Sequence, residues 1–264
     1  MMLTRPGYRT ATIILLTVGA AAVAVAFALP PIPQDPAYHG FADRRALLGV
    51  PNALNVLSNV GFVAVGMLGI AFVVRHHRPV AEGTLTDAWA VTAFGALFAA
   101  VGLTGVGSAW YHLAPTNASL VWDRLPLAVT TTTLLAITIA ERVSLRAARW
   151  LWPPLAAFGV ASVLVWWRGE QTGAGDLRLY GLAQFLPLVT IPLMMALFPP
   201  RYTRGTDLAV ALGWYILGKL CEHLDGPVFA LGHVVSGHTL KHLAAAVAAW
   251  WVLRMLKRRR TVAS

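Results

Sequence analysis

Long apolar segments separated by short connections dominate this sequence. Eight of them approach the length of about 20 residues that a helix needs to cross the hydrocarbon core of a membrane. They cover residues 11–29, 52–74, 88–112, 120–140, 150–167, 178–198, 207–222 and 238–256. Because 57% of the residues are hydrophobic and only 12% are charged, a soluble fold would lack the polar side chains to cover its surface. The sequence therefore predicts an all-α integral membrane protein.

Basic residues occur at alternate connections between these segments. Lysine and arginine beside membrane helices favour the cytoplasmic side. They precede the first segment and follow the second, fourth, sixth and eighth, at Arg5, Arg9, Arg75, Arg78, Arg142, Arg146, Arg149, Arg201, Arg204, Arg254, Lys257, Arg258, Arg259 and Arg260. We therefore expect a multi-pass protein of the bacterial inner membrane with both termini in the cytoplasm. The net charge of +10 suits contact with anionic lipid headgroups and requires no nucleic acid.

The first segment has two interpretations. Two arginines, an apolar run and Ala26-Phe27-Ala28 before PPIPQDP resemble a signal peptide with a small-residue cleavage site. Cleavage would leave seven spans in the same orientation, whereas an uncleaved helix would act as a signal anchor, which we prefer. The expected organisation is an N-terminal helix and linker at residues 1–36, followed by a seven-helix domain at residues 37–260.

Three histidines lie at the ends of apolar segments. Ionisable side chains at membrane depth are energetically costly and often mark a functional site. His112 closes the third segment, and His238 and His242 open the eighth. Asp123 lies near the start of the fourth segment. In an up-and-down bundle these helix ends share one face, so the four side chains are expected at one level near the outer face of the membrane.

Three imidazoles suit a catalytic zinc, which takes three protein ligands and keeps a fourth position for water. His238 and His242 are four residues apart and share a helix face, as do Ser108 and His112. Each residue alone also has another interpretation: a histidine at a helix end can be an interfacial hydrogen-bonded residue, an HxxxH pair can bind haem or line a proton path, and Ser108 can be a packing residue. Asp123 can pair with Arg124 or sit at a helix N-terminus, where the dipole favours it. Their convergence predicts a shared metal site.

Three short runs carry a resemblance to a known family. The runs GSAWYH at 107–112, DRLP at 123–126 and SGHTLKH at 236–242 are similar in order and spacing to those of the alkaline ceramidases. That family belongs to a wider group of seven-span membrane hydrolases that includes the adiponectin-receptor-like proteins. NVLSN at 55–59 resembles the motif that opens the first core helix of ceramidases. The similarity runs from about 38 to 256, so the seven helices of the family would correspond to the second through eighth segments.

The resemblance implies a site and a reaction. It implies that His112, His238 and His242 hold Zn²⁺ and that Ser108 and Asp123 contact the metal-bound water, which zinc makes nucleophilic near neutral pH. The implied enzyme is a zinc-dependent amidohydrolase acting on linear amides, which cleaves a ceramide-like N-acyl lipid from the bilayer into a fatty acid and a long-chain amine. Asp123 would be the general base and later the proton donor, and Ser108 the hydrogen-bond donor to the oxyanion.

One stretch departs from the family pattern. Eukaryotic members carry an acidic, tryptophan-containing calcium site before the first core helix, where this chain reads YHGFADRRALLGVPNALN. Asp43 and Asn52 could supply two oxygen ligands, but Ca²⁺ normally takes six or more. A calcium site on these two residues therefore stays an open alternative.

Other functions and other roles for nearby residues also stay open. An adiponectin-receptor-like receptor or sensor would use the zinc structurally, and a transporter or haem protein could use the HxxxH pair, but neither requires Ser108 and Asp123. His223 and His233 are the alternative ligands on the same face. The pattern leaves the exact lipid and the oligomeric state open.

A charged group near the outer end of the seventh segment also has two interpretations. The group consists of Lys219, Glu222 and Asp225. It is expected to pair with Lys241 through its carboxylates and so to fix the last helix. They could instead line the substrate entry.

Overall fold

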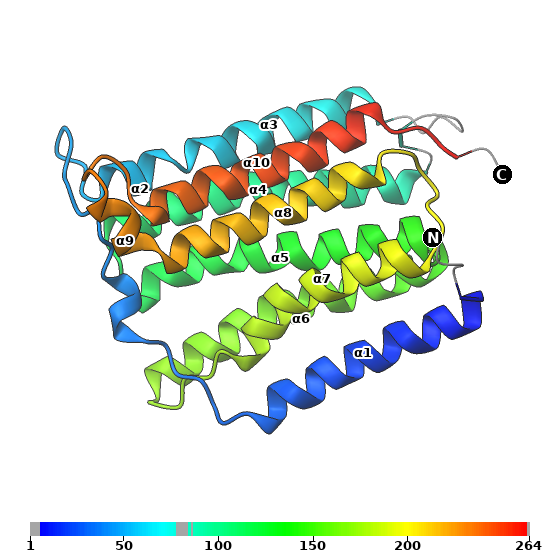
Figure 1. The fold of residues 1–264 in the computed structure, drawn as a ribbon, viewed down its shortest axis with the longest axis horizontal. Coiled ribbons are helices and arrows are strands. Elements are labelled where there is room, and N and C mark those ends of the chain that lie inside the picture. Colours follow the sequence, from blue (N-terminus) through cyan, green and yellow to red (C-terminus); the bar gives the residue numbers. More distant parts are fainter. Residues whose placement is uncertain (1–5, 78–83, 86, 263–264) are drawn as a thin grey trace.

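The chain forms one up-and-down helical bundle, shown in Figure 1. The computed structural model describes residues 6–77, 84–85 and 87–262, so Arg5 and Arg78 lie outside the described residues. Within these ranges the structure contains helices and no β-strand, which confirms the all-α fold. The elements are α1 (Tyr8–Ala28), η1 (Pro36–His39), α2 (Ala53–Leu57), α3 (Val60–Arg75), α4 (Ala88–Leu113), α5 (Asn117–Arg142), α6 (Leu145–Gln171), α7 (Arg178–Leu197), α8 (Gly205–His223), α9 (Asp225–Ala230) and α10 (Gly237–Arg258).

A helix forms at every predicted apolar segment. Six helical units are long and apolar enough to cross a membrane: α1, α2 together with α3, α4, α5, α6 and α7. The two remaining segments form α8 and α10, which carry several charged side chains, among them Asp207, Lys219 and Lys241. The chain is therefore a multi-pass membrane protein by its helices, while the count of eight spans and their orientation stay predictions.

The helix pairing brings distant parts of the sequence to one end of the bundle. The C-terminal end of α4 and the N-terminal ends of α5 and α10 lie at the left in Figure 1, and the two chain ends lie at the right. α10 packs mainly against α8 and α3, and α4 packs between α3 and α5. α1 packs mainly against α7, and Ala11 is its one buried residue among those described. Whether residues 1–36 are cleaved stays a prediction.

Side-chain caps fix where the site helices begin. Thr116 accepts a hydrogen bond from the backbone N–H of Ser119, and the Ser119 hydroxyl accepts one from the backbone N–H of Thr116, which forms a capping box at the start of α5. Because α4 ends at Leu113, only three residues separate the two helices. Ser236 caps α10 in the same way, by accepting from the backbone N–H of Thr239. These caps place the first turns of α5 and α10 beside the end of α4.

Glycines allow the site helices to approach closely. A Cβ atom on Gly107 would collide with the backbone carbonyl of Trp122, so α4 and α5 touch backbone to backbone there. A Cβ atom on Gly237 would collide with the Cys221 carbonyl and lie 2.8 Å from the Asp225 Cα atom. Small residues at such contacts are typical of membrane helix pairs. Gly237 directly precedes His238, and Gly107 is five residues before His112, so both close contacts lie near the turns that carry the histidines.

Candidate metal centre

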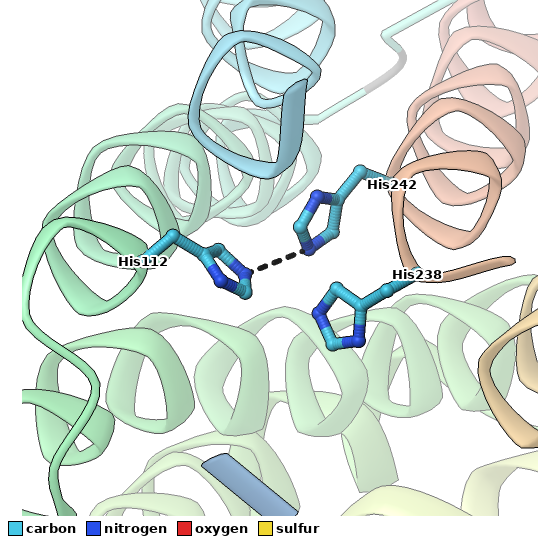
Figure 2. A group of neighbouring side chains, drawn as sticks. All are labelled: His112, His238 and His242. Carbon is cyan, nitrogen blue, oxygen red and sulfur yellow. Dashed lines mark hydrogen bonds between the residues drawn. The ribbon is translucent and has the colours of Figure 1, made fainter. Parts of the chain in front are cut away.

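The three predicted histidines meet inside the bundle, as Figure 2 shows. His112 lies in the last turn of α4, and His238 and His242 lie in the first two turns of α10. All three are buried, and one ligand nitrogen from each lies within 4.8 Å of the other two. Among the described residues, no other group of three or more histidine, cysteine or acidic side chains is so placed. His223 and His233 are thus not part of the cluster.

The geometry of this histidine triad fits one metal ion. The ring centroids of His112, His238 and His242 are 4.8 to 4.9 Å apart in all three pairs, which is a nearly threefold arrangement. The His112 Nε2 and His242 Nε2 atoms are 3.3 Å apart. Ligands of one tetrahedral zinc at bond lengths of about 2.0–2.1 Å lie about 3.3 Å from each other. The spacing also suits an N–H···N hydrogen bond between the rings, so it fits a metal without identifying one.

A hydrogen-bond chain orients the His242 ring. Its Nδ1 atom lies 2.8 Å from the Ser58 hydroxyl, and that hydroxyl donates to the Asn55 carbonyl oxygen at 3.1 Å. Because the serine proton is used on the carbonyl, Ser58 accepts from Nδ1–H. The Nε2 lone pair of His242 is then left facing the centre of the triad. Partners of this kind fix the tautomer and direction of metal-binding imidazoles.

The motif NVLSN therefore supplies support for the triad that the sequence did not assign. The side-chain oxygen of Asn55 accepts from the Thr239 hydroxyl at 2.7 Å and from the Ser236 hydroxyl at 3.5 Å, which ties α2 to the start of α10. Asn59 donates to the Asn55 carbonyl oxygen at 2.7 Å. The available signal was a group of polar side chains at the start of an apolar segment.

His238 is held from two sides. Its backbone N–H donates to Asp225 Oδ1 at 2.7 Å, while Asp225 Oδ2 accepts from the Ala42 backbone N–H at 2.8 Å. Its ring Nε2 lies 2.9 Å from the Lys241 ammonium, which donates to that nitrogen, so a metal ion bound through the same nitrogen would displace the ammonium. Asp225 thus caps the start of α10, and no ion pair with Lys241 is found for it in the described part of the chain. Lys241 pairs instead with Glu222, as predicted, at 3.0 Å.

His112 is enclosed mainly by rings. The Phe41 ring centroid lies 4.6 Å from that of His112 and 4.7 Å from that of His238, so Phe41 covers the triad from the loop side. The backbone carbonyl of His112 accepts from the Asn52 amide at 2.9 Å. The buried His112 Nδ1 atom has no hydrogen-bond partner among the described atoms. This ring therefore owes its position to packing.

Ser108 and Asp123 lie beside the triad. The Ser108 hydroxyl is buried 3.5 Å from His242 Nε2. The Asp123 carboxyl, in the second turn of α5, lines the same cavity as Ser108 and His242. The structure thus brings together all five residues that the sequence singled out for metal binding and catalysis, and their roles stay predictions.

A large cavity opens beside these side chains. Its volume is about 690 Å³, in the range of about 300–1,000 Å³ that is usual for ligand sites. Ser108, Asp123 and His242 line it, together with mostly apolar side chains from α1, α4, α5, α7, α8 and α10. The cavity therefore has room for an apolar ligand beside His242.

The two residues considered for calcium are engaged elsewhere. Both carboxylate oxygens of Asp43 accept from the Arg45 guanidinium, each at 2.8 Å. These hydrogen bonds hold the pKa of the Asp43 carboxyl below its ordinary value. Asn52 uses its amide N–H on the His112 carbonyl. The calcium expectation therefore gains no support from these contacts.

Comparison with known proteins adds no assignment. No family model matches this chain, and no curated protein is similar to it at a significant level. The class defined by fold and site is a multi-pass helical membrane protein with a buried histidine triad that could hold a metal ion. The resemblance to alkaline ceramidases rests on the short runs alone.

Proposed function

We propose that this protein is a zinc-dependent intramembrane amidohydrolase that cleaves a ceramide-like N-acyl lipid to a fatty acid and a long-chain amine. The observation that carries the proposal is the placement of three convergent imidazoles, a carboxyl and a hydroxyl on or beside the wall of one apolar cavity. Closed structural zinc sites have four protein ligands, whereas catalytic ones have three and an open position. Three histidines next to a cavity suit the catalytic kind.

Each residue has a defined task in this reaction. A zinc ion on the triad would polarise the amide carbonyl and lower the pKa of a coordinated water. Asp123 takes the proton from the attacking water and delivers it to the nitrogen of the leaving amine as the C–N bond breaks. Ser108 donates a hydrogen bond to the carbonyl oxygen as negative charge develops on it. Ser58 keeps His242 oriented, and the apolar cavity wall excludes bulk water.

The alternative functions fit these observations less well. A receptor with a structural zinc has no use for a carboxyl and a hydroxyl beside a cavity. A haem with two histidine ligands holds them on opposite faces of the ring, whereas the three imidazoles here lie within 4.8 Å of one another. Iron in the purified protein, or a haem absorbance, would favour the haem protein over the hydrolase.

The test is hydrolysis by the purified full chain. We expect zinc-loaded protein in detergent to release free fatty acid from at least one member of a panel of ceramides and other N-acyl lipids, with the amine appearing in equal amount by mass spectrometry. A receptor would release neither product from any substrate. The protein in which His238 and His242 are both alanine is the matched control for contaminating enzymes.

A further inference from the structure

The cavity wall carries an excess of cations. Among the described residues, three cationic side chains line the cavity and share fewer carboxylates than there are cations: Arg124, Lys219 and Lys241. Two carboxyls line the same wall, those of Asp123 and Glu222. A fourth lining cation, Arg178, is matched separately by an ion pair of 2.7 Å with Asp176 outside the lining. The remaining groups leave one positive charge unbalanced.

Glu222 is shared by two lysines. It pairs with Lys219, and with Lys241 at 3.0 Å, and the Tyr38 hydroxyl also donates to it at 3.3 Å. Burial raises the pKa of Tyr38 well above its ordinary value, so the phenol stays protonated and acts as a donor. One carboxylate therefore serves two ammonium groups, and Lys241 also lies 2.9 Å from His238 Nε2.

Arg124 is buried without an ion pair. Only 4% of the residue is exposed, and its guanidinium carbon lies 4.2 Å from the Trp166 ring centroid and 4.8 Å from that of Tyr180. Its Nη2 donates to the Gln34 side-chain oxygen at 2.6 Å, whereas its buried Nη1 has no hydrogen-bond partner among the described atoms. No ion pair of Arg124 with a described carboxylate is found within 4 Å. A cation kept in this way inside a membrane protein is costly and commonly marks a binding site.

The two cationic groups belong to one wall. The Tyr38 ring centroid lies 5.6 Å from the Arg124 guanidinium carbon, and the hydroxyl of the same side chain contacts Glu222. Tyr38 thus contacts Arg124 on α5 and Glu222 on α8. Through Glu222 it is connected to Lys219 on α8 and to Lys241 on α10. Because Lys241 contacts His238, this wall adjoins the triad.

We propose that this wall binds an anionic group, so that the substrate is an N-acyl lipid whose amine half carries a carboxylate or a phosphate. The identification of this lipid as the substrate rests on the proposed function. The anion site itself is inferred from the cationic side chains alone. With the amide at the triad, Lys241 and Lys219 lie next to the amine half, and the acyl chain occupies the apolar remainder of the cavity. A neutral ceramide would leave the excess charge unmatched.

The first experiment measures binding without turnover. Metal-free full-length protein in phosphatidylcholine nanodiscs is titrated calorimetrically with N-lauroylglycine, with dodecyl phosphate and with neutral N-lauroylethanolamine. Removing the metal ensures that only side chains of the chain attract the anion. We expect at least one anionic lipid to bind about 10- to 100-fold more tightly than the neutral one, as for hydrogen bonds to charged groups. The two anionic lipids distinguish a carboxylate from a phosphate.

Variants show which cations are responsible. Lys219→Met and Arg124→Met should each reduce the preference for the anionic lipid by about tenfold, whereas Arg178→Gln, the matched control on the same wall, should not. Lys219 is partly exposed, so its variant decides the question if the Arg124 variant does not fold. Equal binding of neutral and anionic lipids, an unchanged preference in Lys219→Met, or an equal loss in Arg178→Gln would overturn the proposal.

The second experiment separates the anion site from the reaction. Zinc-loaded protein is given N-lauroylglycine, N-lauroylethanolamine phosphate and N-lauroylethanolamine, and release of lauric acid is followed. If none is cleaved while anionic lipids bind preferentially, the hydrolase function is wrong and the anion site stands. If the neutral lipid is cleaved as fast as both anionic ones and binds as tightly, the function stands and the anion site is wrong.

Discussion

The two ends of the α8 and α10 pair carry similar charged residues, but the surroundings of these side chains differ. At the end near the chain termini, Asp207 at the start of α8 is bound by Arg204 and Arg254, each at 2.9 Å. At the other end, Glu222 is shared by Lys219 and Lys241 beside the cavity of about 690 Å³. A second pocket near the terminal end, between α4, α5 and the neighbouring loops, holds only about 10 Å³. The Asp207 carboxylate is buried between its two arginines, whereas Lys219, Glu222 and Lys241 line the large cavity.

Structural and functional charges in a membrane bundle can be distinguished by whether protein groups satisfy them. Arg259 is buried at the terminal end, where its guanidinium donates to Glu141 and to the Thr84 carbonyl oxygen. Arg124 is buried near the cavity, and its Nη1 has no hydrogen-bond partner in the described part of the chain. Buried polar groups are normally hydrogen-bonded, so an unpartnered charged group beside a cavity with room for a ligand points to one. The terminal end also has an unpartnered buried atom, Trp89 Nε1, but only the small pocket lies beside it. We call the end near the chain termini the closed end of the bundle, and the end beside the large cavity the open end.

The largest effect is expected at the open end for Asp123→Asn. If Asp123 handles the proton without binding the metal, the variant should keep zinc and fold while turnover falls by about 10² to 10⁴, the usual contribution of a general base. The measurement is fatty-acid release together with metal content. A variant that turns over as fast as the wild type would refute this role for Asp123 and leave the metal site untouched.

The closed end should show its effect in stability. Asp207→Asn removes the buried charge between two partly exposed arginines, and hydrogen bonds to charged groups contribute about 1.5–3 kcal/mol. Thermal unfolding in detergent should reveal this loss, with activity per folded molecule unchanged. Glu222→Gln is the matched change at the open end and should destabilise less, because its partners border the cavity. An equal or larger loss for Glu222→Gln would remove the distinction between the two ends.

Ser108→Ala should reduce turnover by about ten- to a thousandfold, less than the aspartate variant. The range is that of one oxyanion donor whose place water can partly take. Because Ser108 also lies 3.5 Å from His242 Nε2, metal content must be measured in the same sample. Loss of metal along with activity would show that Ser108 supports the triad and does not act on the substrate.

The smallest effect is a pH dependence in the loop that covers the triad. Hydrogen bonds from Arg45 lower the pKa of Asp43 in the folded protein. The carboxylate therefore stabilises the fold above its unfolded pKa of about 3.9, and this contribution is lost as pH falls through the folded value. Asp43→Asn should unfold about 2 °C below the wild type at pH 7, with the gap closing under pH 4. A gap that persists in acid would exclude the ion pair as its cause.

Much of the fold could be predicted from the sequence because membrane helices are specified by local apolarity. Each predicted segment became helical, the second as α2 and α3, and alternation of helix direction was enough to place His112, Asp123 and His238 at one end. The triad followed from the high cost of histidine at membrane depth. In these respects the information is local.

The supporting contacts could not be predicted because they join residues far apart in the chain. The contact of Ser58 with His242 spans 184 residues, and that of Tyr38 with Glu222 also spans 184. Both depend on side-chain rotamers that no sequence pattern encodes. Asp225 shows the opposite error: its charge suggested an ion pair with Lys241, whereas the unpaired N–H groups at the start of α10 compete for the same carboxylate.

The central claim is that the histidine triad holds one metal ion that drives amide hydrolysis. The most direct test removes the metal with a chelator and titrates Zn²⁺ back while fatty-acid release from an N-acyl lipid is followed. We predict no release without metal and a rise that levels off at about one zinc per chain, with neither zinc binding nor release in the His238→Ala, His242→Ala double variant. Full release from metal-free protein, or full zinc occupancy in the double variant, would contradict the account.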